Sequence, residues 1–254
     1  CVITSGTPDF TGVIWEGQCQ NQEFTGATTV CAIGGGTTSA SAYKHLTTVS
    51  GASFRDNANV QTNALRYNAS NGCGIRGTGV QENTVAVTEL NARVSKLQLT
   101  GTGSGGRGLV LGTVSGGSLA EFCIIEGNYA GNINGVGVLV CSATVTVRNC
   151  VIVLRASAAD HIVGTGAGSP SFYNCTIVAP DDLATAPISL FLSGASGTVT
   201  VQNCGLFAGD STKAIKAGSA TFNFTTCYSD ISGTAGVTQT TYSSEFQNVN
   251  DASG

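Results

Sequence analysis

A cysteine recurs in the same local setting at nearly constant intervals along this chain. Clear copies are Glu-Phe-Cys123-Ile-Ile, Arg-Asn-Cys150-Val-Ile, Tyr-Asn-Cys175-Thr-Ile and Gln-Asn-Cys204-Gly-Leu, and Thr-Thr-Cys227-Tyr is a weaker one. Successive copies follow one another at nearly the same distance along the sequence, and self-similarity at a short, regular period indicates a repeat architecture. Because each repeat is rich in β-branched residues and punctuated by glycine, one repeat is expected to form one coil of a stacked β-solenoid.

The repeat extends toward the N-terminus. Leu97 takes the cysteine place one period before Cys123, and Cys73 lies one period before Leu97. The residue two positions after the cysteine is apolar in the clear copies, at Cys123, Cys150, Cys175 and Cys204, so the period of two places both on the interior face of a strand. Coils stacked about 4.8 Å apart align such residues into a column. This structural core column is predicted to contain Cys73, Leu97, Cys123, Cys150, Cys175, Cys204 and Cys227.

Asparagine directly precedes three of these cysteines. We expect Asn149, Asn174 and Asn203 to form a neighbouring column at a bend, where side-chain amides bind backbone groups and one another. Cys31-Ala-Ile33 looks like one more copy of the setting, but it lies well over one period before Cys73. That gap holds either two short coils or one coil with an insertion.

Composition agrees with a solenoid. Charged residues make up 10% of the chain, and there are 35 glycines against 4 prolines, so strand and turn formers dominate. The net charge is −4 and the basic residues look scattered along the sequence, which argues against nucleic acid as a partner. No apolar stretch is long enough for a membrane-spanning helix, so no membrane partner is expected.

The motif Asn-Cys-x-Ile followed closely by glycine resembles that of the right-handed parallel β-helix family, which has the pectin-lyase-like fold. The resemblance implies an all-β fold, a right-handed parallel β-helix in which residues 61–235 form the coils. Residues 1–60 do not obey the period and are expected to form an irregular N-terminal cap or attachment segment. Residues 236–254 are expected to form a C-terminal tail or cap.

A second resemblance rests on short phrases. Phe24-Thr-Gly-Ala-Thr-Thr, Ile33-Gly-Gly-Gly-Thr-Thr-Ser and Ala64-Leu-Arg-Tyr-Asn-Ala-Ser-Asn-Gly72 are similar to the first coils of β-helix proteins in tailed-phage virions. This resemblance implies a capsid decoration (cement) protein on the exterior of the virion, bound to the major capsid protein, with a homotrimer as the expected assembly. Two alternatives remain open: a tailspike or fibre that binds or degrades polysaccharide, and a bacterial surface adhesin.

Residues 1–60 also contain the candidate attachment residues. Trp15 is the only tryptophan and is either an interface anchor or a buried cap residue. Cys1, Cys19 and Cys31 lie outside the column and are candidates for a disulfide, within the chain or to a neighbouring subunit. The column cysteines are expected to be reduced and to serve packing. No zinc-type spacing is present, so neither a metal nor another cofactor is expected.

Candidate catalytic residues are few. Asp181 and Asp182 are the only adjacent acids and Asp160-His161 is the only acid next to a histidine, while His45 has no acidic neighbour in the sequence. A proline-flanked acid pair is typical of a loop or helix cap, and a lone histidine among small apolar residues is typical of a structural hydrogen bond. Solenoid hydrolases carry paired acids and a glycine-flanked histidine on successive coils, and here only the bare acid pair is present. The sequence therefore predicts that the chain is not an enzyme.

Overall fold

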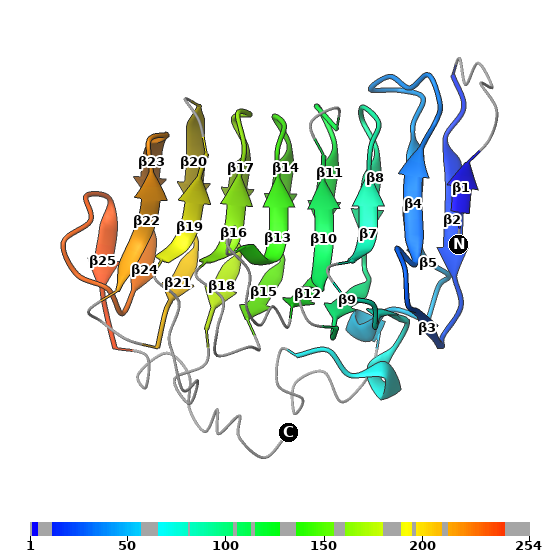
Figure 1. Ribbon diagram of the computed structural model, residues 1–254, viewed down its shortest axis with the longest axis horizontal. Coiled ribbons are helices and arrows are strands. Elements are labelled where there is room, and N and C mark those ends of the chain that lie inside the picture. The colour runs from blue at the N-terminus through cyan, green and yellow to red at the C-terminus, as the bar shows by residue number, and fades with distance from the viewer. Residues whose placement is uncertain are drawn as a thin grey trace.

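A computed structural model describes residues 2–4, 12–56, 66–80, 82–103, 106–112, 115–127, 136–154, 161–179, 189–194, 197–209 and 213–241; for residues 2–4, 136 and 137 only the backbone is described. Among these residues nearly all regular structure is β-strand, and the strands pair in parallel within three sheets. The sheets wind together into one elongated solenoid (Figure 1). The predicted all-β parallel solenoid is thereby confirmed.

We number the three sheets I, II and III. Successive strands belong to sheets I, II and III in turn, so each coil of the chain adds one strand to each sheet. Sheet I contains β1 (Val2–Thr4), β4 (Cys31–Gly34), β7 (Asn83–Val87), β10 (Arg107–Leu111), β13 (Val136–Cys141), β16 (His161–Thr165), β19 (Ser189–Ser193) and β22 (Ala214–Gly218). Sheet II contains β2 (Trp15–Cys19), β5 (Lys44–Thr48), β8 (Arg93–Ser95), β11 (Leu119–Glu121), β14 (Thr146–Arg148), β17 (Ser171–Tyr173), β20 (Thr198–Gln202) and β23 (Thr221–Thr225). Sheet III contains β3 (Glu23–Gly26), β6 (Gly74–Gly77), β9 (Gln98–Gly101), β12 (Ile124–Gly127), β15 (Val151–Leu154), β18 (Thr176–Val178), β21 (Gly205–Phe207), β24 (Cys227–Ser229) and β25 (Val237–Gln239).

The strand register places the predicted column residues at equivalent positions of successive coils. Ile75, Leu99, Ile125, Ile152 and Ile177 are direct partners from β6 to β18. The column residue lies two positions before each of them, and the same register continues through β21 and β24. The column members are buried inside the solenoid: Cys73, Leu97, Cys123, Cys150, Cys175, Cys204 and Cys227.

The column thiols bind backbone carbonyls at the corner between sheets II and III. The Sγ atom of Cys150 donates to the carbonyl oxygen of Arg148 at 3.2 Å and to that of Ala120, one coil earlier, at 3.7 Å. Equivalent pairs of bonds recur at Cys123, Cys175, Cys204 and Cys227. Cysteine fits this corner because it is small and apolar and still supplies a weak donor.

The residue directly before each column member, from Leu97 onward, has a left-handed backbone conformation. The φ angles of Asn149, Asn174 and Asn203 are 53°, 51° and 54°. Asparagine tolerates this region better than most residues, which explains its recurrence at the bend. The Nδ2 atom of Asn174 donates to Oδ1 of Asn149 at 3.3 Å, so neighbouring amides also bind one another.

The irregular segment expected over residues 1–60 differs from the structure. Strands β2, β3, β4 and β5 lie within it and pair in the same three sheets as the later coils. The period is lost because the lap between β5 and β6 carries an insertion with two short 3₁₀ helices, η1 (Phe54–Asp56) and η2 (Ala69–Asn71). The repeat assigned to Cys31 is also wrong, since Cys31 lies in sheet I and pairs with Val85.

At the other end, β25 pairs with β24 in sheet III, so the described part of the chain continues the same sheet beyond residue 235. Within the described residues no helix has the length and apolar character needed to cross a membrane.

Candidate functional site

Exposed hydrophobic side chains gather at the N-terminal end of the solenoid. Val13, Ile14 and Trp15 are consecutive, and their exposed fractions are 54%, 50% and 41%. Trp15 opens β2, which pairs only with β5 among the described strands, and β1 and β3 likewise have one described neighbour each. The exposure of Trp15 does not fit a buried cap residue; its role as an interface anchor stays a prediction. Unpaired edges of this kind can accept a further strand.

An apolar hollow opens into the core at this end. Its volume is about 110 Å³, and its walls come from β2, β3, β4, β5 and β6. Cys19, Phe24, Cys31 and Leu46 contribute side chains to it. The hollow is large enough for one apolar side chain, because a buried cavity only somewhat larger holds a small aromatic molecule.

The described cysteines at this end are not in a disulfide. Cys19 and Cys31 are both free and buried, and the same holds for the other described cysteines; Cys1 lies outside the described residues. Cys19 and Cys31 therefore do not pair with each other, and they lie on different sheets, Cys19 on β2 of sheet II and Cys31 on β4 of sheet I. A disulfide to Cys1 or to a neighbouring subunit stays a prediction. A hydrogen bond with Cys19 raises the pKa of the Cys73 thiol, and burial raises the pKa of Cys31 to about 11.

A buried ion pair lies close to this end. Lys44 Nζ is 2.8 Å from Glu89 Oε2 and donates to the carbonyl oxygen of Gly34 at 2.5 Å. Both side chains are almost completely buried. The amide of Gly36 donates to the same carboxylate at 3.2 Å. The pair ties the corner after β4 to the corner after β7 and is buried too deeply to meet a substrate.

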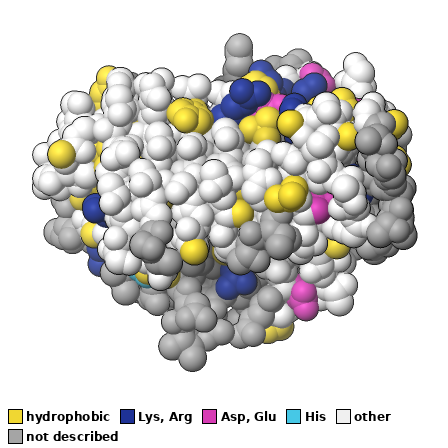
Figure 2. All heavy atoms as spheres, turned by 90° about the horizontal axis from the view of Figure 1, so that it is seen from above, with side chains coloured by type: hydrophobic (Ala, Val, Ile, Leu, Met, Phe, Trp, Pro, Cys, Tyr) yellow, Lys and Arg dark blue, Asp and Glu magenta, His cyan; other side chains and the backbone are white. Residues whose placement is uncertain are grey.

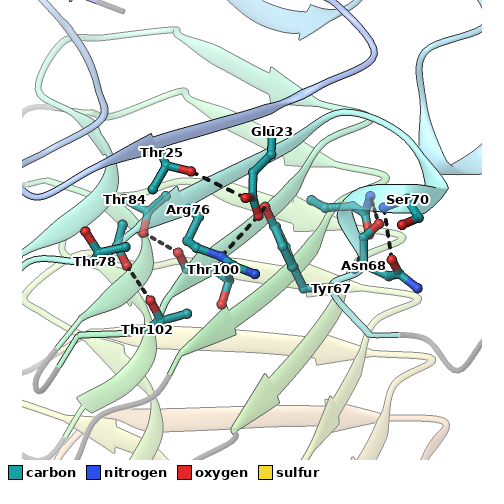
Figure 3. Close-up of polar contacts among 12 residues, drawn as sticks. Glu23, Thr25, Tyr67, Asn68, Ser70, Arg76, Thr78, Thr84, Thr100 and Thr102 are labelled. Carbon is teal, nitrogen blue, oxygen red and sulfur yellow. Dashed lines mark hydrogen bonds and ion pairs between the residues drawn. The ribbon is translucent and has the colours of Figure 1, made fainter. Parts of the chain in front are cut away.

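A second polar cluster lies on the outer face of sheet III (Figure 3). The hydroxyl of Tyr67 donates to Glu23 Oε1 at 2.7 Å, and Arg76 Nε lies 3.1 Å from the same oxygen. The backbone amide of Tyr67 donates to Glu126, and that of Asn68 to Gln98 Oε1 at 2.9 Å. We call these residues, Glu23, Tyr67, Arg76, Gln98 and Glu126, the Glu23 cluster. It holds the segment before η2 against β3, β6, β9 and β12.

The Glu23 cluster places two carboxylates around one tyrosine, from coils that are far apart in sequence. Burial, followed by the hydrogen bond to Glu23, raises the pKa of Tyr67 well above its usual range. The Tyr67 hydroxyl therefore stays protonated and donates. Sequence reasoning missed this cluster because Glu23 and Glu126 stand alone in the sequence; only alignment of Gly26, Gly77, Gly101 and Gly127, which are register partners, reveals it.

Both histidines form hydrogen bonds to serine side chains within the solenoid. His45 does have an acidic neighbour, because the coil before it brings Glu16 Oε2 to 3.4 Å from Nδ1, and Nε2 lies 2.8 Å from Ser95 Oγ. Burial lowers the pKa of His45 despite Glu16. His161 Nδ1 lies 2.7 Å from the buried hydroxyl of Ser189, which donates to the carbonyl oxygen of Phe191. Asp160, Asp181 and Asp182 lie outside the described residues.

No protein-family model matches the sequence, and no curated protein matches it either. Among solved structures, the chain is similar to the pectin methylesterase from Aspergillus niger in its deglycosylated form. The match has a TM-score of 0.50 and 12% sequence identity, and it covers 90% of this chain and 80% of that one. At this identity the likeness shows the fold: the chain is a right-handed parallel β-helix.

This comparison corrects one prediction. The sequence predicted that the chain is not an enzyme, whereas the solved structure that it resembles is an enzyme. The missing hydrolase motifs were the basis of the prediction, and they exclude one kind of polysaccharide hydrolase only. A β-helix supports other chemistries with other residues, because function depends on the site and not on the fold.

Proposed function

We propose that this β-helix is a structural protein of a tailed-phage virion that docks through its N-terminal end onto the capsid surface, as a decoration protein. The observation that carries the proposal is the exposed run of Val13, Ile14 and Trp15 beside β1, β2 and β3, each of which has an edge that no described strand pairs with. Aromatic and aliphatic side chains of this kind anchor interface centres. The sequence phrases that resemble phage β-helix proteins lie in the same coils and in the insertion that follows them.

The proposed partner is the major capsid protein, on the exterior of the virion. We further propose a homotrimer about a three-fold axis, because three copies place three exposed tryptophans on one docking surface and cover open sheet edges. Light scattering of the purified chain tests the assembly. A mass of one subunit at micromolar concentration would exclude a stable trimer.

Docking is tested with capsid shells assembled without this protein. The wild-type chain is expected to sediment with the shells, and Trp15→Ala is expected to weaken binding at least tenfold, since a central aromatic anchor contributes about 2 kcal/mol or more. Tyr228→Ala is the matched control, because Tyr228 is 49% exposed and lies on β24 at the opposite end. Equal binding of the two variants, or no binding of the wild type to any shell, would contradict the proposal.

A second candidate function is action on a polysaccharide, and the Glu23 cluster is the observation that favours it. Glu23 is partly exposed, and its carboxylate is positioned by the Tyr67 hydroxyl and by Arg76. Glu126 is buried and accepts from the backbone amide of Tyr67, so Glu23 is the carboxylate of the cluster that a substrate can reach. Carboxylates are the usual acid and base in glycoside hydrolysis. The test measures methanol release from pectin and new reducing ends from a polysaccharide panel. Glu23→Gln should abolish activity, while Glu16→Gln on the neighbouring edge strand should retain it; an inactive wild type excludes this candidate.

A further inference from the structure

The basic side chains are not spread evenly over the molecule. The chain has 11 basic residues, and four of them lie on or beside the outer side of sheet II: Arg55, Arg93, Lys96 and Arg148. The register pairs Ser95 with Glu121 and Glu121 with Arg148, so Arg93 on β8 and Lys96 directly after β8 lie two coils from Arg148. Figure 2 shows basic side chains gathered beside acidic and hydrophobic ones on a face that is otherwise mostly uncharged.

Two aromatic rings hold the guanidinium groups of this basic cluster. The Cζ atom of Arg55, from η1, lies 4.1 Å from the centre of the Phe122 ring. The Cζ atom of Arg93 lies 4.1 Å from the centre of the Tyr43 ring. A guanidinium stacked on a ring keeps its N–H edge free to donate to an anion. In the next coil, Phe122 occupies the corner position equivalent to that of Lys96.

The charges of the cluster are only partly balanced. Arg148 binds Glu121 Oε2 through Nε at 2.8 Å and Nη2 at 2.6 Å. The carboxylate of Asp56, next to Arg55, accepts from the amides of Gly51 and Ser53. Arg55, Arg93 and Lys96 form no ion pair with any acid that the structure describes. Glu16 is a third acid on this face, because it pairs in register with His45 and His45 with Arg93. Four positive and three negative groups leave a local charge of +1 on a chain whose net charge is −4.

Uncharged polar side chains continue this face toward the C-terminal end. Tyr173 and Gln202 follow Arg148 in register, and Thr146, Ser171 and Thr200 follow Arg93 and Leu119. None of these five side chains donates or accepts a hydrogen bond within the described part of the chain. They form rows about 4.8 Å apart along the solenoid, a spacing close to the length of one sugar ring.

We propose that the outer face of sheet II binds an acidic polysaccharide that lies along the solenoid axis. Carboxylate or sulfate groups bind Arg55, Arg93, Lys96 and Arg148, and sugar hydroxyls bind the polar rows. A nucleic acid strand fits less well, because it needs positive charge along its whole length and finds it only near β8 to β14. The site is on the side of the solenoid, so it is independent of docking through the N-terminal end.

Binding is measured by titration calorimetry with alginate, which carries carboxylates, and with dextran sulfate, which carries sulfates. Neutral dextran is the control polymer. At least one acidic polymer should bind and neutral dextran should not, and binding should weaken as salt rises. Arg93→Gln and Lys96→Gln should each weaken binding about three- to tenfold, which corresponds to about 0.7 to 1.4 kcal/mol, because each removes a charge-assisted hydrogen bond. The preferred polymer identifies the anionic group.

Lys216→Gln is the matched control variant, because Lys216 also lies over an aromatic ring, 5.3 Å from the centre of Phe222, and belongs to β22 of sheet I. It should bind as the wild type does. Lys96 is exposed, so Lys96→Gln tests the site even if the arginine variants fold poorly. Three results would overturn the proposal: no binding of either acidic polymer, equal affinity of Lys96→Gln and wild type, or tighter binding of polyphosphate or single-stranded DNA than of both polysaccharides.

Discussion

At the corner between sheets II and III, one residue in each coil from Lys96 onward has the left-handed backbone conformation. Six described residues adopt it with φ between 51° and 61°: Lys96, Phe122, Asn149, Asn174, Asn203 and Thr226. A left-handed conformation costs a residue with a Cβ atom about 1–2 kcal/mol, and asparagine relieves part of that cost through its short polar side chain. Threonine fits worst, because a β-branched residue in this region is an outlier.

Thr226→Asn should therefore stabilise the protein by about 1 kcal/mol, or about 2–4 °C in melting temperature for a chain of this size. Thr225→Asn is the control, because Thr225 precedes it on β23 with an ordinary strand conformation. Thermal unfolding followed by circular dichroism measures both. An equal or larger gain for Thr225→Asn would show that the gain does not come from the backbone conformation.

The buried ion pair supplies a second prediction at this scale. Lys44→Met leaves the carboxylate of Glu89 buried without its cation, so the free energy of unfolding should fall by about 3–5 kcal/mol. The double variant Lys44→Met, Glu89→Leu removes both charges and should recover most of that loss. Urea unfolding measures the three proteins. If the double variant is as unstable as the single one, the loss comes from packing and not from the unpaired charge.

At the scale of the element, the sequence predicted sheet III best. The cysteine setting marks the corner before each of its strands, and the apolar residue two positions later marks the interior face. Sheets I and II have no such recurring residue, so Cys31, which lies on β4 of sheet I, was assigned to the cysteine column before sheet III. The insertion between β5 and β6 hid the first coils, because a repeat is recognised only while its period holds.

The sites were harder to predict than the coils. Arg93 and Arg148 lie far apart in the sequence, and the register brings them to one face, whereas Arg55 reaches that face from η1 by its contact with Phe122. One signal was present: Glu121, Arg148, Tyr173 and Gln202 each stand two positions before a column cysteine, and that position faces outward on sheet II. Alignment on the cysteine therefore predicts which side chains share this face, whereas the insertion that positions Arg55 and Tyr67 follows no repeat.

The buried thiols of the solenoid give a pH dependence. Burial raises the pKa of Cys31 from 9.0 to about 11. The unfolded chain then loses this proton before the folded one, so the contribution to stability is complete below pH 9 and is lost as the pH rises through 11. Two pKa units correspond to about 2.7 kcal/mol. Between pH 9 and 11 the free energy of unfolding should fall less steeply in Cys31→Ala than in the wild type, and the slopes should differ by the equivalent of up to one bound proton. Urea unfolding at each pH measures the slope, and an unchanged slope would refute the assignment.

The molecule is a one-dimensional stack, since among the described strands each coil pairs only with the coil before it and the coil after it. In such a protein, stability is approximately the sum of the stabilities of the coils and of the contacts between neighbours. The aromatic side chains lie along this stack. Phe172 on β17, with two further strands of sheet II on its C-terminal side, is fully buried and meets Phe191 edge to face at 5.3 Å. Phe224, on the last strand of sheet II, is partly buried and stacks on Phe222 at 5.6 Å.

Removal of an aromatic ring should therefore have a local effect that depends on its position. Phe172→Ala should cost about 3–5 kcal/mol and lower amide protection most strongly in β14, β17 and β20, leaving protected coils on both sides. Phe224→Ala should cost less and lower protection only from β20 to β25, because an end coil has neighbours on one side. Hydrogen exchange with mass spectrometry resolves the two patterns. An equal loss of protection in every strand of both variants would mean that the solenoid unfolds as a single cooperative unit, and the nearest-neighbour description would then fail.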